Sequence, residues 1–357
     1  MRQDFADVRP NIPPSPQVTL VVPNYNHARY LRESLGSIAA QTRAPDRVLI
    51  VDDASTDDSV SIISRFIAER RGWELIQHKE NRGVVRRQNE ALAAVTTEWI
   101  GFLGADDVLQ PTYLEKALAE AARHPEVGLI CACCEIIGLS ERRMLRPMML
   151  PAPSSTLLAP ADVRKILLAG DNYFPGMVSL FRRKATLSLG GFDESLGSFA
   201  DSLLARQLAL SFGFFFLAEI LGYWRIHGQN FSVTSTSDPA VLSTKVAQIR
   251  NVIKHSDLFP SGFDELFERR TRFGAARTVL SAKTPVGVKA VQAAALLKGG
   301  DNERRFLKLM LGFGYPGRVA ALAWVTLRTR PMSLLRLVGQ LGARRAILAA
   351  STAYRAP

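Results

Sequence analysis

The feature that most constrains the fold of this chain is a regular alternation between Gln17 and Cys134. Short apolar runs rich in β-branched residues alternate there with stretches in which apolar residues recur at helical spacing, as Leu31, Leu35 and Ile38 do. This alternation is typical of stacked strand–helix–strand units and predicts a largely parallel sheet flanked by helices. The expected strands begin at Val18, Arg47, Trp73, Trp99 and Val127.

Basic charge is concentrated in the last third of the chain. The 357 residues include 45 Lys and Arg against 33 Asp and Glu, a formal net charge of +12. Residues 240–357 hold 20 of these basic side chains but only 6 of the acidic ones, so the preceding part is close to neutral. We therefore expect an extended leader at 1–16, one domain at 17–239 and a basic helical region at 240–357.

The basic region interleaves arginine with Leu, Val, Ala and Trp, as in RVAALAWVTLRTR from Arg318. A basic helix with one apolar face can lie in the interface of an anionic membrane, so peripheral membrane contact through 240–357 is one interpretation. The other is a helical subdomain that packs on the preceding domain with its arginines in solvent. Nucleic acid is not expected as a partner, because the region lacks interleaved aromatic stacking residues and any known nucleic-acid-binding module.

Targeting signals are not evident in the sequence. The first 17 residues lack the apolar core of a signal peptide, and the longest apolar run, Leu208 to Ala218, is too short to cross a bilayer as a helix. We expect a cytoplasmic protein, with the inner face of the cytoplasmic membrane as the place where the basic region would make contact.

Polar clusters follow four of the predicted strands. PNYNH follows the first strand, Asp52 and Asp53 end the second, Asn81-Arg82-Gly83 follows the third and Gly104-Ala105-Asp106-Asp107 follows the fourth. Each cluster alone is compatible with ordinary turn chemistry. Because ligands bind beyond the carboxyl ends of strands in open α/β sheets, the four together predict one site at that edge.

The carboxylates of this edge suggest a cation and a nucleobase. Asp106 and Asp107 can bind Mn²⁺ or Mg²⁺ together with substrate phosphates, although Asp107 is equally suited to cap the following helix. Asp53 can accept a hydrogen bond from a pyrimidine N–H, and Tyr25 can stack on a base, unless Tyr25 only covers the sheet edge. The sequence contains no Walker A motif, and its GxGxxG match, GFGYPG from Gly312, lies in the basic helical region and not after a predicted strand, which disfavours P-loop NTPases and Rossmann dehydrogenases.

The order and spacing of these segments resemble family 2 glycosyltransferases of the GT-A fold. VVPNYNHARYLRESLGSIAAQ, VLIVDDAST, ENRGVVRRQNEAL and WIGFLGADDVLQP resemble the nucleotide-binding half, at 17–125. GGFDE from Gly190, then Asp201, then LGYWRIH from Leu221 resemble the acceptor and catalytic half, at 126–239. The resemblance implies a Rossmann-like, mixed α/β sheet flanked by helices, followed here by a helical C-terminal extension.

The resemblance also implies roles for individual residues in an inverting transfer from a nucleotide sugar. Asp201 would be the general base, and Mn²⁺ or Mg²⁺ would be the cofactor. Asp107 and His227 would hold the metal, and Arg225 would help to bind the diphosphate. The nucleotide would be held by Pro23, Tyr25 and Asp53 around the base and by Asp106 near the ribose.

Three positions depart from the family pattern. Gly104 stands where an aspartate is usual, Ala200 replaces the glutamate before Asp201, and Gln88 occupies a position often held by arginine. The expected metal site therefore has one carboxylate fewer than usual, which leaves room for a weakened enzyme.

The sequence favours an enzyme that transfers one or a few sugars from a donor, most simply UDP-linked, to a glycan or a polyprenyl-lipid-linked acceptor in cell-surface polysaccharide synthesis. It lacks the Gln-x-x-Arg-Trp motif of processive polymerases. One alternative is a non-catalytic protein of the same fold whose basic tail engages membrane or nucleic acid. Another is a nucleotidyltransferase, against which the order of the motifs argues.

Overall fold

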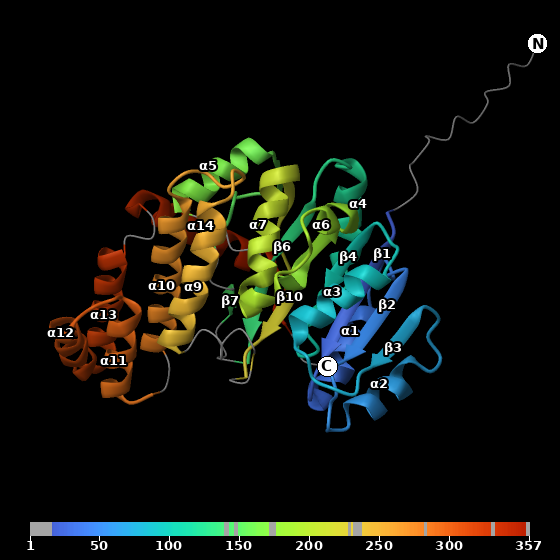
Figure 1. Ribbon diagram of the computed structural model, residues 1–357, viewed down its shortest axis with the longest axis horizontal. Coiled ribbons are helices and arrows are strands. Elements are labelled where there is room, and N and C mark those ends of the chain that lie inside the picture. The colour runs from blue at the N-terminus through green and yellow to red at the C-terminus, as the bar shows by residue number, and fades with distance from the viewer. Residues whose placement is uncertain are drawn as a thin grey trace, which may run out of the picture.

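The computed structural model describes residues 16–138, 143–145, 149–170, 176–227, 230, 238–281, 284–329 and 333–354. The predicted leader, 1–16, lies outside these residues except for Pro16. Figure 1 shows a sheet flanked by helices at one end of the molecule and a helical extension at the other.

The described strands form one mixed sheet with the order β3-β2-β1-β4-β9-β6-β10-β5. Its predicted strands are confirmed as β1 (Val18–Asn24), β2 (Arg47–Asp52), β3 (Trp73–Gln77), β4 (Trp99–Phe102) and β6 (Leu129–Ile137). The others are β5 (Val108–Leu109), β7 (Met144–Leu145), β8 (Thr156–Leu158), β9 (Ser179–Arg182) and β10 (Phe214–Arg225). The short strands β7 and β8 pair with β6 and β10.

Strand β9 runs antiparallel in the middle of the sheet, which alternation alone did not predict. It pairs antiparallel with both β4 and β6, and β10 pairs parallel with β6. Strands β6 and β10 therefore run in the same direction as β1, β2 and β4, and their carboxyl ends reach the same edge. Strand β9 begins where the others end, which brings the short 3-10 helix η1 (Gly176–Val178) to that edge as well.

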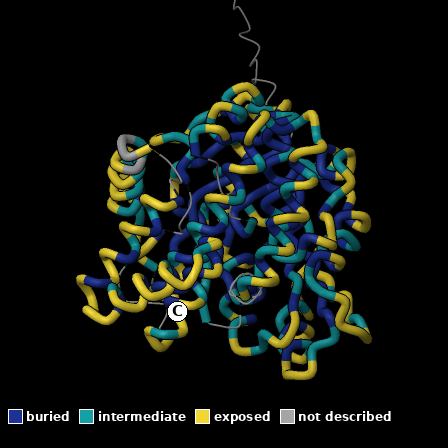
Figure 2. Tube along the Cα trace, turned by 60° about the vertical axis from the view of Figure 1, so that its left-hand side comes forward, coloured by how far each residue is buried: buried dark blue, intermediate teal, exposed yellow. Residues whose placement is uncertain are grey.

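Successive residues of the central strands point to opposite faces of the sheet, as the pleat requires. Leu20 and Val22 of β1 pack with α1 (Ala28–Ala39), α2 (Ser59–Ile67) and α4 (Tyr113–Arg123). Val21 packs on the other face, where the helices are α3 (Val84–Ala94), α5 (Pro160–Gly170), α6 (Arg183–Ser188) and α7 (Ala200–Phe212), the last preceded by η2 (Glu194–Phe199). Figure 2 shows the resulting buried interior as a continuous dark-blue core.

The C-terminal region is helical, as predicted. Asp238 caps its first helix by accepting the N–H of Ala240 at 2.8 Å. The helices are α9 (Pro239–Lys254), α10 (Phe263–Ser281), α11 (Val286–Leu296), α12 (Asp301–Gly312), α13 (Gly314–Thr329) and α14 (Leu334–Ala350). Within the described residues, no helix is both long enough and apolar enough to span a membrane.

Two hydrophobic cores meet in α9 and α10. Ile249 and Phe263 belong to the core that lies against the sheet, whereas Val246 and Ala276 of the same helices belong to a second core shared with α11, α12 and α13. The extension is therefore a subdomain packed on the sheet domain, the second of the two interpretations that the sequence left open. This packing does not test membrane contact.

Candidate active site

The loops after β1 and β2 interlock at the carboxyl edge of the sheet. The side-chain amide of Asn24 donates to Oδ1 of Asp52 at 2.7 Å, and Oδ1 of Asn26 accepts the backbone N–H of Thr56 at 2.7 Å. The hydroxyl of Ser34 in α1 donates to the carbonyl of Gly104 at 3.2 Å, which ties the loop after β4 to the same edge. The structure thus brings together loops that the sequence predicts to form one site.

Asp53 anchors the loop after β3. Its buried carboxylate accepts the backbone N–H groups of Arg82 at 3.0 Å and Gly83 at 2.8 Å, and Nε of Arg87 at 2.6 Å. Burial lowers the pKa of Arg87, but its hydrogen bonds to Glu90 and Asp53 outweigh this effect and leave the pKa raised, so the guanidinium stays charged. Asp53 is therefore held rigidly at the end of β2.

Pro23 and Tyr25 lie beside this carboxylate in the chain. Pro23 is half-buried in β1, in register with Val51 of β2. The side chain of Tyr25 is 44% exposed, so its ring is open to solvent instead of being buried over the sheet edge. Their contact with a nucleobase remains a prediction.

Three side chains form a group that is suited to a metal ion. One ligand atom from each of His27, Asp106 and His227 lies within 4.8 Å of the other two. Nε2 of His227 is 2.9 Å from Oδ2 of Asp106, and the amide of Asn230 donates to the same oxygen at 3.0 Å. Burial lowers the pKa of His27, which favours the neutral imidazole that a metal requires. The Nδ1 atom of His27 is buried and has no hydrogen-bond partner among the described residues.

Asp107 is placed differently from its neighbour. It is buried, and its Oδ1 accepts the backbone N–H of Arg225 at 2.9 Å, because β5 pairs antiparallel with the end of β10. Helix α4 begins at Tyr113 with Thr112 at its N-cap, so Asp107 is not a helix cap. Asp107 is not part of the group formed by His27, Asp106 and His227. Its assignment to the metal remains a prediction.

Arg225 connects β10 to both flanking elements. Its Nε donates to the carbonyl of Asp106 at 2.9 Å, and a terminal nitrogen donates to Oε2 of Glu33 in α1 at 2.6 Å. The guanidinium lies over the ring of Tyr30, with Cζ 5.1 Å from the ring centroid. Part of its charge is thus already paired with Glu33, and contact with a diphosphate remains a prediction.

Asp201 lies in the first turn of α7 and is half-buried. A Cβ atom added to Gly176 would be 2.6 Å from Oδ2 of Asp201. Because η1 lies at the carboxyl edge of the sheet, this contact places Asp201 at the edge that carries the other candidate residues. It is not a residue displayed on the outer face of α7, which was the alternative interpretation.

Sequence reasoning did not single out His27, Glu33, Arg87 or Asn230. His27 belongs to the PNYNH cluster, whose position after β1 was a usable signal. Arg87 immediately precedes Gln88, the position where the family often has arginine. Glu33 and Asn230 are identified only by their tertiary partners.

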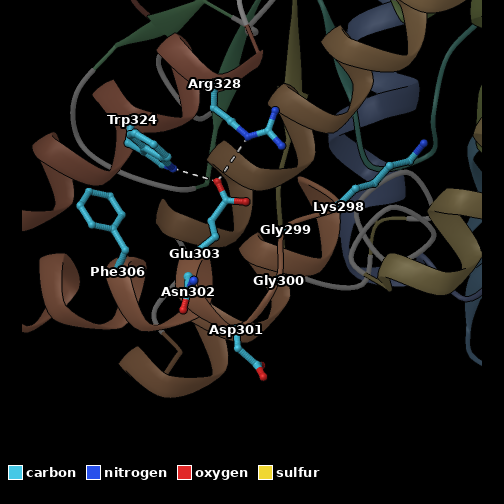
Figure 3. A pocket seen from close by; sticks show the side chains of 9 residues that line it. All are labelled: Lys298, Gly299, Gly300, Asp301, Asn302, Glu303, Phe306, Trp324 and Arg328. Carbon is cyan, nitrogen blue, oxygen red and sulfur yellow. Dashed lines mark hydrogen bonds and ion pairs between the residues drawn. The ribbon is translucent and has the colours of Figure 1, made fainter.

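A separate cavity of about 630 Å³ lies in the helical extension, between α12 and α13. Figure 3 shows Trp324 and Arg328 converging on Glu303. The indole N–H donates to Oε1 of Glu303 at 2.8 Å, and Phe306 packs against the same indole with ring centroids 4.9 Å apart. This cavity shares no residue with the site at the sheet edge.

The mixed sheet flanked by helices, with carboxylates and imidazoles at its carboxyl edge, agrees with the GT-A fold that the sequence motifs predict. Residues 19–189 match the family model described as Glycosyl transferase family 2. This segment of the chain is therefore a family 2 glycosyltransferase domain, as the sequence motifs predict.

Related sequences carry similar names. An uncharacterized glycosyltransferase of Nostoc sp. is 29% identical over 225 residues, which are 62% of this chain and 68% of that protein. The O-antigen biosynthesis protein RfbC of Myxococcus xanthus is 29% identical over 245 residues, 67% of this chain but only 18% of that protein.

Solved structures share the fold at low sequence identity. S. aureus TarS 1-349 in complex with UDP-GlcNAc has a TM-score of 0.59 and 16% identity, and the match covers 88% of this chain and 91% of that one. The mannosyltransferase PcManGT from Pyrobaculum calidifontis, in complex with GDP-Man and Mn²⁺, has a TM-score of 0.55 and 23% identity over 94% of this chain and 90% of that one.

Proposed function

We propose that this protein is an inverting glycosyltransferase that uses a nucleotide-sugar donor, most simply UDP-linked, and a glycan or lipid-linked glycan acceptor in cell-surface polysaccharide synthesis. The observation that carries the proposal is the group of His27, Asp106 and His227 at the edge that also holds Asp53. The donors named for TarS and PcManGT and the O-antigen role named for RfbC are consistent with it.

The cation is proposed to be Mn²⁺ in preference to Mg²⁺. Two imidazoles and one carboxylate make a softer ligand set than carboxylates alone, and Mg²⁺ prefers oxygen ligands. The Nδ1 atom of His27, which has no hydrogen-bond partner in the part of the chain that the structure describes, supports a ligand at this point. When bound, such a cation would neutralise charge on the departing diphosphate.

The remaining residues bind and orient the donor. Asp53 is fixed by two backbone N–H groups and Arg87, so its position does not depend on the ligand. Tyr25 offers an open ring on which a base can stack. Arg225 holds the loop of Asp106 and Asp107 against β10 and adds positive potential beside the diphosphate.

Asp201 is proposed to accept the proton of the acceptor hydroxyl. As the acceptor oxygen bonds to the anomeric carbon, the bond from that carbon to the diphosphate breaks on the opposite side, and the configuration inverts. The proton passes to Asp201 and the electron pair leaves with the nucleoside diphosphate. This single displacement needs no covalent enzyme intermediate.

The test measures release of UDP or GDP from a panel of donors, with Mn²⁺ present, for wild type and variants. Asp201→Asn should lose activity and keep nucleotide affinity, whereas the exposed carboxylate variant Asp257→Asn should match the wild type. Full activity of Asp201→Asn would contradict its role as base. Absence of UDP and GDP binding at millimolar concentration would favour the non-catalytic alternative.

A parallel titration assigns the metal ligands. We expect Asp106→Ala and His27→Ala to weaken Mn²⁺ binding more than Asp107→Ala does, measured calorimetrically without donor. The reverse order would favour the prediction from family resemblance, in which Asp107 holds the metal.

We also propose that the extension contacts anionic lipid, which would bring a cytoplasmic enzyme to the inner face of the cytoplasmic membrane. Helices α12 and α13, with the residue that joins them, carry apolar side chains that are 50% to 70% exposed: Leu309, Phe313, Val319 and Leu327. The same helices carry Arg305, Lys308, Arg318 and Arg328. Exposed apolar residues among cations match the requirements of an interfacial surface.

Co-sedimentation with vesicles that contain anionic lipid tests this surface in the full chain. Leu309→Asp combined with Phe313→Asp should reduce vesicle binding at low salt by about tenfold or more, because two apolar side chains that would be buried in the lipid are lost. Leu168→Asp, at an exposed apolar position on α5, serves as the matched control. Equal sedimentation of all three proteins would reject the membrane proposal.

A further inference from the structure

The segment after α14 reaches the candidate active site. The ring of Tyr354 packs on that of Tyr223, with centroids 4.7 Å apart and an interplanar angle of 55°. Its hydroxyl lies 3.5 Å from the terminal nitrogen of Arg225 that is bonded to Glu33. Tyr223 and Arg225 are close together at the end of β10, so Tyr354 covers the strand end that carries Arg225.

Arg143 fastens this segment to the sheet. Its guanidinium makes a bidentate pair with the buried Glu135 of β6, at 3.0 and 2.9 Å. The same guanidinium donates to the carbonyls of Leu348 and Ser351, both at 2.9 Å, and to the Ser351 hydroxyl at 2.7 Å. The hydrogen bond to Glu135 raises the pKa of Arg143, which keeps it charged at the carboxyl end of α14, where a cation is favoured.

Helix α14 is docked over its C-terminal half. The side-chain amide of Gln340 accepts the N–H of Leu150 at 2.8 Å and donates to its carbonyl at 3.0 Å. Arg344 donates to the carbonyl of Leu145 at 2.8 Å, and Ile347 is buried in the core that lies against the sheet. With Arg143, these contacts fix the direction in which the chain leaves the helix toward Arg225.

We propose that Tyr354 is a positioning residue of the transferase site and acts through Arg225. Arg225 holds the carbonyl of Asp106 and the carboxylate of Asp107. With its ring packed on Tyr223 and its hydroxyl at the guanidinium, Tyr354 reduces the access of water to this strand end and so strengthens the pairing of Arg225 with Glu33. Loss of the ring would expose the pair, loosen the loop of Asp106 and Asp107 and weaken the grip on a nucleotide with its metal. The inference rests on the proposed function.

The experiment is calorimetric titration of the full-length protein with UDP, and with GDP, in the presence of Mn²⁺. Tyr354→Ala should weaken nucleotide binding about fivefold, whereas Tyr354→Phe keeps the ring and should stay within about twofold of wild type. Tyr315→Ala, at an exposed tyrosine on α13, is the control and should bind like wild type. Thermal unfolding of each variant should change little, since Tyr354 is at the margin of the core.

A double-mutant cycle with Arg225→Lys separates positioning from general structural damage. In that background, Tyr354→Ala should add less than about a twofold further loss, because its partner is already altered. Unchanged affinity in Tyr354→Ala, equal losses in Tyr354→Ala and Tyr354→Phe, or a full additional loss beside Arg225→Lys would overturn the proposal. Failure of the wild type to bind either nucleotide would instead overturn the proposed function, and the positioning role with it.

Discussion

A Cβ atom at Gly176 would lie 2.6 Å from Oδ2 of Asp201. A side chain at this position must therefore displace the proposed base. We expect Gly176→Ala to lower kcat at least about tenfold, because small displacements of a reacting group are costly. Affinity for UDP with Mn²⁺ should stay within about twofold, since the donor site is formed by other loops. Gly287→Ala, which meets nothing within 4 Å, is the control; a KM effect without a kcat effect would contradict the role of Asp201.

Gly104→Asp restores the aspartate that family resemblance places in the loop after β4, yet we expect it to impair the site. The added Cβ would lie 2.7 Å from Oδ1 of Asp106 and 2.9 Å from Oδ2 of Asp107. Both carboxylates must shift, and Mn²⁺ affinity should fall about tenfold by calorimetry. A gain in affinity would show that the loop adapts to a third carboxylate.

Arg87→Met should lower the free energy of unfolding by about 3 kcal/mol, because it leaves the buried carboxylate of Asp53 without its cationic partner. Arg86→Met is the matched control. Arg86 is exposed and pairs with Glu90 only at 3.4 Å, so its loss should cost less than about 0.5 kcal/mol. Urea unfolding measures the free energy of unfolding of both variants. Equal losses would mean that the buried Arg87–Asp53 pair stabilises the fold no more than the exposed Arg86–Glu90 pair does.

Glu268→Gln should destabilise the extension in a pH-dependent manner. Burial raises the pKa of Glu268, but its bonds to Lys298 and Arg272 outweigh this and lower the pKa from 4.5 to about 2. A lowered folded-state pKa contributes stability above pH 4.5, which is lost as the pH falls toward 2. The free energies of unfolding of wild type and variant, measured in urea, should differ by about 2 kcal/mol near neutral pH and converge as the pH falls from 4.5 toward 2. A difference in unfolding free energy that stays constant across this pH range would contradict the lowered pKa of Glu268.

Local periodicity was sufficient to predict the strands from β1 to β4, β6 and the edge where their loops meet. It did not predict β9, because a four-residue antiparallel strand between distant partners leaves no distinctive pattern in the sequence. The docking of α14 is likewise decided by contacts such as that of Arg143 with the carbonyl of Leu348, which sequence spacing does not reveal.

The candidate site was predicted in part for the same reason. Asp53, Asp106 and Asp201 follow or precede recognisable elements, so their placement could be inferred. The grouping of Asp106 with His27, its hydrogen bond from Asn230 and the pairing of Arg225 with Glu33 depend on how separate loops meet in space. Only the structure therefore raises the question of whether Asp106 or Asp107 faces the metal.

Helices α9 and α10 each have one end in the core against the sheet and the other in the core of the outer helices. The two helices therefore set the distance and the orientation between the α12–α13 surface and the carboxyl edge of the sheet. If that surface rests on a bilayer, the edge is held at one fixed height above the lipid. The enzyme would then serve acceptors whose reactive hydroxyl lies at that height above the lipid. The distance spanned by α9 and α10 would in this way select acceptors by their length.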